Sequence, residues 1–156
     1  MEIMKNIDLN ESNLFSKNII ELKLISDRMA EDKDNENGII FTNMHQILFI
    51  LNRKETVTPR EIISELNIAK SNLAILAKKM IDDGLIESHK DKTNKREIFY
   101  NITPEGKVTL QKRLDTIDEY YGVETKSTIN ALIRAVNELK KIENKRLKKN
   151  RKANSK

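Results

Sequence analysis

The sequence predicts a mainly α-helical protein that carries one small β-hairpin. Apolar residues recur at helical spacing over most of the 156 residues, and they alternate as in a strand only between residues 85 and 102. Two segments, Thr58–Glu61 and Thr103–Glu105, have the residue order of a helix start, with a threonine cap before a proline. A chain of this length forms one domain by default, or two subdomains that share a modest core.

Two helices are predicted before residue 52. The first spans Glu11 to Ala30, and the acidic stretch from Glu31 to Gly38 ends it. The apolar positions of this first helix are Phe15, Ile19, Leu22 and Met29, with Leu14 and Ile25 beside them. Thr42 is the expected N-cap of the second helix. Its apolar face is Met44, Ile47, Leu48 and Leu51, while Phe49 and Ile50 extend the apolar surface, so we expect this helix to be covered on most sides.

A short polar connection, Asn52 to Val57, leads to two helices joined by a tight turn. Thr58 caps the first of them, Pro59 suits its first turn and Glu61 completes a capping box. Its inward residues are Ile62, Ile63 and Leu66. After a turn at Asn67 and Ile68, the next helix opens near Ala69 and ends at Gly84; its apolar face is Leu73, Leu76, Ala77 and Met80.

The period then changes from helix to strand. Residues 85–90 and 97–102 are the two expected strands, and a polar tip of residues 91–96 connects them. A further helix starts at Thr103-Pro104-Glu105 and breaks at Gly122. The last helix carries Ile129, Leu132, Ile133, Val136 and Leu139, and the final twelve residues hold seven basic residues and no acidic one.

This order of elements is typical of a winged helix-turn-helix. A helix held by one apolar face presents its other face outward, and Ser71, Ile75 and Lys78 point away from the apolar set at 100° per residue. Residues 70–72 occupy the first turn, which usually reaches base edges. We therefore expect DNA contacts from Lys70, Ser71, Asn72, Ala74, Ile75, Lys78 and Lys79 on this helix and from Lys95 and Arg96 at the hairpin tip.

Between about residues 40 and 106 the sequence resembles the MarR family of transcriptional regulators. The resemblance rests on Thr42 and on the segments 58–66 (TPREIISEL), 70–73 (KSNL), 80–86 (MIDDGLI), the basic wing and 102–106 (ITPEG), taken in this order and spacing. It implies a dimeric DNA-binding repressor that a small molecule or other signal releases from DNA. It also implies dimerisation through the helices that flank the winged module, and an effector site, which we expect near Phe15, Met44 and His45.

The sequence departs from the family pattern at several positions. Asn94-Lys95-Arg96 stands where members often have Asp-Arg-Arg, which leaves Asp91 as the residue that could bridge the wing. Ser88 and Ile75 replace common arginines, and Ala69 replaces the hydroxyl cap of the recognition helix. Ile75 is either tolerated surface or a contact for a thymine methyl group; Asn72, which can pair with adenine, favours the second reading and an A/T-rich palindromic operator.

Composition excludes several other classes of protein. The chain has no cysteine, so it holds no disulfide, thiolate zinc site or cysteine nucleophile. It shows no glycine-rich phosphate loop and no catalytic constellation, and His45 and His89 are better explained as structural residues than as metal ligands. We therefore expect no enzyme activity and no cofactor. The longest apolar run, residues 47–51, is far too short for a bilayer span, and no secretory signal is visible, so a cytoplasmic protein is expected.

Charge is distributed unevenly along the chain. Residues 1–38 carry a net charge of −4, residues 39–104 carry +2 and residues 105–156 carry +7. Such asymmetry indicates either a polyanion partner or a solvated lysine-rich surface. We expect residues 39–104 to form the winged module, residues 1–38 and 105–149 the dimerisation helices, and residues 150–156 a disordered basic tail. The basic segment 145–156 is either a solvated helix end or a non-specific DNA tether. A module for protein or RNA contacts within a larger assembly is the alternative function.

Overall fold

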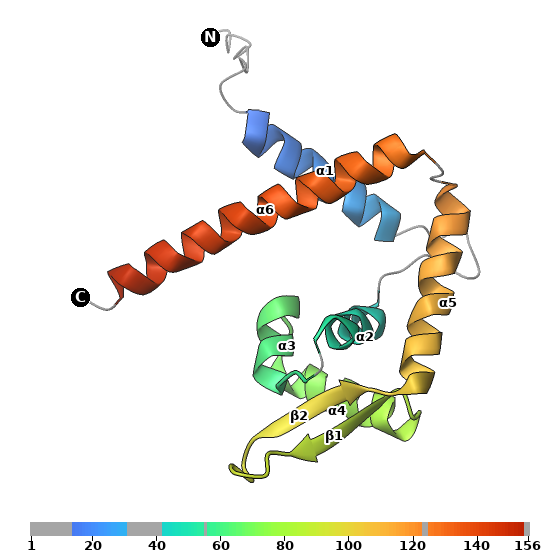
Figure 1. Cartoon of the computed structure of the whole chain (residues 1–156), viewed down its shortest axis with the longest axis vertical. Coiled ribbons are helices and arrows are strands. Elements are labelled where there is room, and N and C mark those ends of the chain that lie inside the picture. Colours follow the sequence, from blue (N-terminus) through green and yellow to red (C-terminus); the bar gives the residue numbers. More distant parts are fainter. Residues whose placement is uncertain (1–13, 31–41, 55, 123–124, 155–156) are drawn as a thin grey trace, which may run out of the picture. The chain divides into compact units, whose positions relative to one another are not determined.

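A computed structural model describes residues 14–30, 42–54, 56–122 and 125–154 (Figure 1). These residues form six helices and one antiparallel hairpin, as the sequence predicts: α1 (Leu14–Ala30), α2 (Asn43–Arg53), α3 (Pro59–Leu66), α4 (Lys70–Asp82), β1 (Ile86–Lys90), β2 (Ile98–Ile102), α5 (Pro104–Tyr121) and α6 (Lys126–Ala153). The start of the first expected helix, residues 11–13, and the acidic stretch 31–38 lie outside the described residues. The chain divides into two compact units between Arg113 and Leu114, within α5.

The predicted capping signals set the helix boundaries. Thr42 caps α2, since its hydroxyl accepts a hydrogen bond from the His45 N–H at 3.4 Å. The capping box of α3 is complete: the Glu61 N–H donates to the Thr58 hydroxyl at 3.3 Å, and the Thr58 N–H donates to the Glu61 carboxylate at 2.8 Å. Asn67 takes the left-handed conformation that ends α3, with φ of 52°. The expected caps are therefore confirmed at both helices.

A glycine ends α4 and aims the chain into the hairpin. Gly84 has φ of +72°, a conformation that disfavours any residue with a Cβ. The Gly84 N–H donates to the Ile81 carbonyl and the Leu85 N–H donates to the Met80 carbonyl, both at 2.9 Å. This pattern is a Schellman motif. In this motif the residue three before the C-cap, which is Asp83 here, packs against the residue two after it. Met80 and Leu85 are both buried, as the motif requires.

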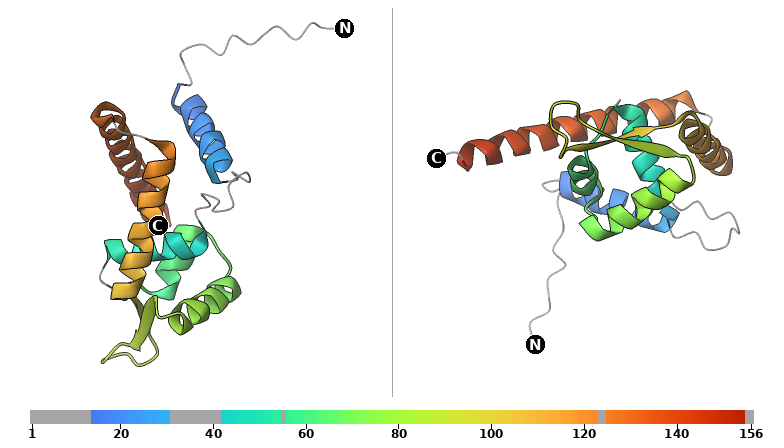
Figure 2. Two further views of the ribbon diagram at one scale, coloured as in Figure 1. Left: turned by 90° about the vertical axis from the view of Figure 1, so that its right-hand side faces the viewer. Right: turned by 90° about the horizontal axis from the view of Figure 1, so that it is seen from below.

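The core lies inside the winged module. Its members come from α2, α3, α4, the hairpin and the start of α5: Ile47, Leu48, Ile50, Leu51, Val57, Ile62, Leu73, Ala77, Met80, Leu85, Ile86 and Leu110. The hairpin pairs Ile86 with Ile102 and Lys90 with Ile98, so its base is anchored in this core while its tip projects. Figure 2 (left view) shows α4 and the hairpin at the same end of the module.

The connection between α2 and α3 differs from the sequence prediction. α2 continues through Arg53, and Val57 is completely buried instead of lying in a polar link. Val57 pairs with Tyr100 of β2: the Tyr100 N–H donates to the Val57 carbonyl at 2.8 Å, and the Val57 N–H donates to the Tyr100 carbonyl at 3.2 Å. The side of α2 that carries Phe49 was expected to be covered, but Phe49 is 48% exposed, with the Arg53 guanidinium 5.7 Å from the ring centroid.

The C-terminal prediction also needs correction. Residues 150–156 were expected to be a disordered tail, yet α6 continues to Ala153. Lysine and arginine are good helix formers, and their charges are favourable at the negative end of the helix dipole. None of the helices in the described ranges combines the length and apolar composition that crossing a bilayer requires.

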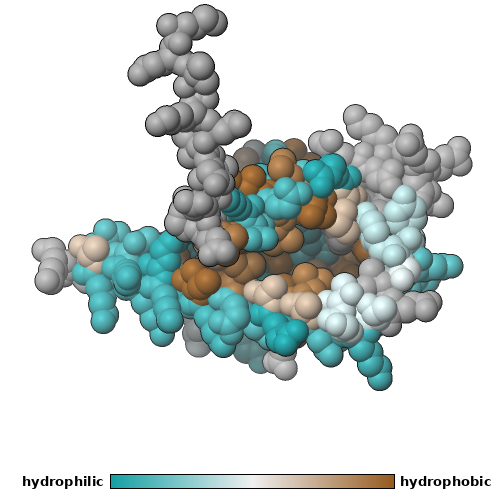
Figure 3. Space-filling view, turned by 90° about the horizontal axis from the view of Figure 1, so that it is seen from above, coloured by the Kyte–Doolittle hydropathy of each residue, from teal (hydrophilic) through white to brown (hydrophobic). Residues whose placement is uncertain are grey.

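The terminal helices expose apolar side chains. On α1 these include Phe15, Ile20 and Leu24, and on α6 they include Leu132 and Ile133. Figure 3 shows hydrophobic surface on the terminal helices and hydrophilic surface over the C-terminal part of α6. An exposed apolar helix face is typical of an interaction surface.

Candidate nucleic-acid interface

α4 is buried along one face only. Leu73 and Ala77 are each 2% exposed and Met80 is completely buried, whereas Ile75 is 72% exposed. Ser71 and Lys78 are also exposed, on the same side as Ile75. The helix is thus attached to the core by its inner face, and its outer face is available to a partner, as the apolar spacing predicts.

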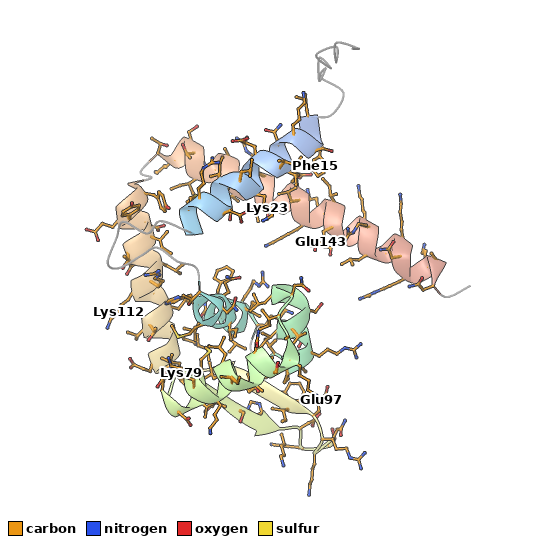
Figure 4. The ribbon with its side chains drawn as sticks, turned by 180° about the vertical axis from the view of Figure 1, so that it is seen from behind. Phe15, Lys23, Lys79, Glu97, Lys112 and Glu143 are labelled. Carbon is orange, nitrogen blue, oxygen red and sulfur yellow. The ribbon has the colours of Figure 1, made fainter. Side chains whose placement is uncertain are left out.

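The remaining predicted contact residues of α4 surround this outer face. Lys70, Asn72, Ala74 and Lys79 are all exposed; Figure 4 labels Lys79. Ala69 precedes the helix, and no side chain among the described residues caps it. The N–H groups of the first turn therefore have no intrahelical partner, and such groups attract anions.

The hairpin tip is folded by two short side-chain turns. The Asp91 carboxylate accepts hydrogen bonds from the N–H of Thr93 at 2.8 Å and from its hydroxyl at 3.0 Å, and the N–H of Arg96 donates to the Asn94 side-chain oxygen at 3.3 Å. The backbone bond from Thr93, followed by its hydroxyl, lowers the pKa of Asp91. Asp91 therefore stabilises its own turn, and no ion pair between it and Arg96 occurs in the described structure.

Three cationic residues from three elements line one hollow of about 440 Å³. Arg60 comes from α3, Lys70 from α4 and Arg96 from the hairpin. The rest of the lining is Thr58, Pro59, Ile63, Glu97 and Ile98. Within the described residues these three cations form no ion pair, so their charge is available to an anion.

Arg60 is a candidate contact that the sequence reasoning missed. In the sequence, residues 58–61 indicate only a helix start. Helical spacing is the signal that could have found it. Arg60 lies two residues before Ile62, and therefore on the opposite side of α3; Ile62 is buried and Arg60 is exposed.

A second hollow, of about 380 Å³, differs in its electrostatics. It is lined by Leu51, Asn52, Arg53, Lys54, Asn101, Ile102 and Lys107. Two of its cations already have carboxylate partners: Arg53 pairs with Glu65 at 2.5 Å, and Lys54 pairs with Glu61 and Glu65, each at 3.3 Å. The Glu65 hydrogen bond is the main cause of the raised pKa of Lys54. This hollow is therefore a poorer anion site than the one formed by Arg60, Lys70 and Arg96.

Comparisons with known proteins identify the module. Residues 45–121 match the model of the winged helix DNA-binding domain family. The apo MarR structure from E. coli aligns with a TM-score of 0.59 over 89% of this chain and 98% of MarR, at 15% sequence identity. Residues 45–121 therefore form a winged helix domain, and the chain has the fold of MarR.

Two further known proteins extend the comparison. A mutant MarR from E. coli, solved in complex with operator DNA, aligns with a TM-score of 0.53 over 83% of this chain and 96% of that one, at 16% identity. The HTH-type transcriptional regulator PetP of Rhodobacter capsulatus is 34% identical over 70 residues, which make up 45% of this chain and 42% of PetP. The chain thus spans less than half the length of the curated relatives it matches.

The three residues expected near an effector occupy two helices of this winged helix protein. Met44 and His45 are half-buried in the first turn of α2, and Phe15 is 56% exposed on α1. His45 Nδ1 lies 2.7 Å from the Thr42 hydroxyl. Burial, followed by the charge of Arg113, lowers the pKa of His45, so its imidazole is neutral at pH 7. Neither hollow described above is lined by these three residues.

Proposed function

We propose that the protein is a transcriptional regulator that binds duplex DNA with α4 in the major groove. One observation carries this proposal: Ile75, Ser71 and Lys78 are exposed along a helix whose other face is buried in the core. A helix held in this way can enter the major groove of B-DNA, which is about 12 Å wide, while its inner face stays packed on the core. Two similar proteins support this proposal. The MarR mutant solved with operator DNA shares the fold, and the regulator PetP shares part of the sequence.

The outer face of α4 favours A/T base pairs. The amide of Asn72 matches the paired donor and acceptor of adenine, and the exposed side chain of Ile75 matches the methyl group of thymine. Neither residue attracts a phosphate by charge. We therefore assign base reading to Asn72 and Ile75, and an A/T-rich operator to the protein.

The cations around this face contact the DNA backbone. Arg60, Lys70 and Arg96 surround one hollow and suit a phosphate group that lies between α4 and the wing. Lys95 is exposed at the hairpin tip, where it reaches the minor groove or its flanking phosphates. Lys78 and Lys79 add positive charge along α4. These contacts set orientation and affinity, whereas Asn72 and Ile75 set sequence preference.

The protein acts as a homodimer. The exposed apolar residues of α1 and α6 need a cover, and a second copy supplies one with two-fold symmetry. Two copies of α4 then enter successive major grooves of a palindrome. In this arrangement residues 1–38 and 105–149 are the dimerisation helices, residues 39–104 are the DNA-binding module, and the protein works in the cytoplasm beside the DNA it regulates.

Repression is the expected outcome of binding, and a signal relieves it. A small molecule that prefers a dimer with a different spacing of its two α4 helices shifts the population away from the DNA-binding form. The region of Phe15, Met44 and His45 remains our proposed place for such a ligand.

Fluorescence anisotropy tests the proposal. The full chain is titrated into a duplex from the region upstream of its own gene and into a shuffled duplex of the same composition. The wild type should prefer the upstream duplex, and Lys78→Glu should weaken that binding on the order of tenfold or more. Lys112→Glu is the matched control, because it makes the same charge change at an exposed site on α5 (Figure 4). Equal binding of both duplexes by the wild type would refute the proposal.

A further inference from the structure

The C-terminal half of α6 carries a line of lysines on one side of the helix. Lys141, Lys145, Lys148 and Lys152 are spaced four, three and four residues apart, and all four are exposed. At 3.6 residues per turn they fall within an arc of about 60° and extend over about 16 Å of helix. We call these four residues the lysine stripe.

The stripe faces away from the apolar surface of the same helix. Ile129, Leu132, Ile133, Val136 and Leu139 are centred on the opposite side of α6, about 155° from the stripe. A partner that covers the apolar residues therefore leaves the lysines accessible. Figure 4 shows long side chains with nitrogen tips on α6 between the labelled Glu143 and the C-terminal end.

Negative charge is nearly absent from this region. Glu143 is the one acidic residue between positions 140 and 153, and it falls on the side opposite the stripe. Glu138 pairs with Lys141 at 2.7 Å, at the beginning of the stripe. The hydrogen bond from Lys141, followed by its charge, lowers the pKa of Glu138. The charge of Lys145 also acts on Glu138, and Lys148 and Lys152 follow farther along the helix, so the stripe presents a repeated positive charge.

We infer that the lysine stripe binds the phosphate backbone of duplex DNA without reading its sequence. Each strand of a duplex carries one phosphate per about 3.4 Å of axis, so about 16 Å of one strand presents about five phosphates to the four lysines. Lysine is a point charge that binds phosphate without the fixed geometry that base reading requires. The inference rests on the proposed function only for the choice of DNA among polyanions.

The composition of this segment argues against a membrane surface. A helix that lies in a bilayer interface needs an apolar face beside its basic one. Ile142 and Leu147 are the large apolar residues between positions 140 and 153, and they are about 140° apart around the helix. They form no common face that could enter lipid.

The test compares two triple variants of the full chain. Lys145→Gln, Lys148→Gln and Lys152→Gln together remove three charges from the stripe, whereas Lys140→Gln, Arg146→Gln and Arg151→Gln remove three charges from other sides of the same segment. Glutamine has a helix propensity close to those of lysine and arginine, so α6 should persist in both, and circular dichroism checks this. Binding to the upstream duplex, to a shuffled duplex and to anionic vesicles is measured over a range of salt concentrations.

The stripe variant should bind both duplexes more weakly, and its log–log salt slope should be shallower by about 2 to 3 for each copy bound, while the preference between the duplexes is unchanged. The control variant should change the slope by less than half as much. Equal slopes for the two variants, or a loss confined to vesicle binding, would overturn the inference. A wild type without sequence preference whose slope still depends on the stripe would overturn the proposed function and leave this inference standing.

Discussion

The contact between the start of α5 and Leu85, which lies between α4 and β1, should make Gly106→Ala strongly destabilising. A Cβ at position 106 would lie 2.1 Å from the Leu85 carbonyl oxygen and 2.9 Å from Ile102 Cγ1. The first of these is a backbone atom, so it cannot rotate away. The Leu85 carbonyl also accepts hydrogen bonds from the Thr103 N–H at 3.1 Å and the Thr103 hydroxyl at 3.0 Å. The start of α5 must therefore move, and both bonds weaken.

The expected cost follows from these contacts. Overpacking a tight site costs about 1–3 kcal/mol, and two weakened hydrogen bonds add about 1–2 kcal/mol. The better helix propensity of alanine returns about 0.5–1 kcal/mol. The free energy of unfolding should thus fall by about 1–4.5 kcal/mol, which urea denaturation followed by circular dichroism measures.

Gly122→Ala separates this steric effect from backbone strain. Gly122 has φ of +56° and open space where a Cβ would stand, so its replacement should cost only about 1–2 kcal/mol of left-handed strain. If Gly106→Ala were as stable as the wild type, the close packing of α5 against Leu85 would be wrong.

Three other variants or conditions test separate parts of the site. Ile75→Ala should reduce discrimination at one A·T step by about 1 kcal/mol in competition titrations, whereas Ile81→Ala, at an exposed position on another side of α4, should not; equal loss on all sequences would contradict base reading. The capping box should contribute about 1 kcal/mol, measured as the loss of unfolding free energy in Thr58→Ala. The hydrogen bond from the Thr58 N–H is the main cause of the lowered pKa of Glu61, so the stability that the capping box contributes is present above pH 4.5 and is lost as the pH falls through the lowered pKa of Glu61 in the folded protein. Glu61→Gln should reduce this loss of stability in acid. Parallel curves of stability against pH for Glu61→Gln and the wild type would contradict this prediction. If a dimer neutralises about 6–8 phosphates, the log–log salt slope should be about −5 to −7, and a slope near zero would exclude backbone contacts.

Local signals made most of the fold predictable. The capping box of Thr58 and Glu61 involves residues three apart, and Gly84 ends α4 through bonds within one turn. The outer face of α4 follows from helical spacing alone, which is why the exposure of Ile75 could be expected.

Non-local contacts explain what the sequence did not reveal. Val57 pairs with Tyr100, forty-three positions away, through a single bridge that leaves no alternating pattern. The position of Arg60 beside Lys70 and Arg96 depends on how α3, α4 and the hairpin pack together. The continuation of α6 to Ala153 was obscured because a run of lysines resembles a solvated tail as closely as it resembles a helix end.

Selection from a pool of randomised duplexes tests the central claim most directly, because it asks whether the protein reads bases at all. The full-length wild type should enrich an A/T-rich palindrome with half-sites about 10 base pairs apart, centre to centre. Recovery of a pool with the same base composition as the input would contradict the account of α4 as a reader of the major groove.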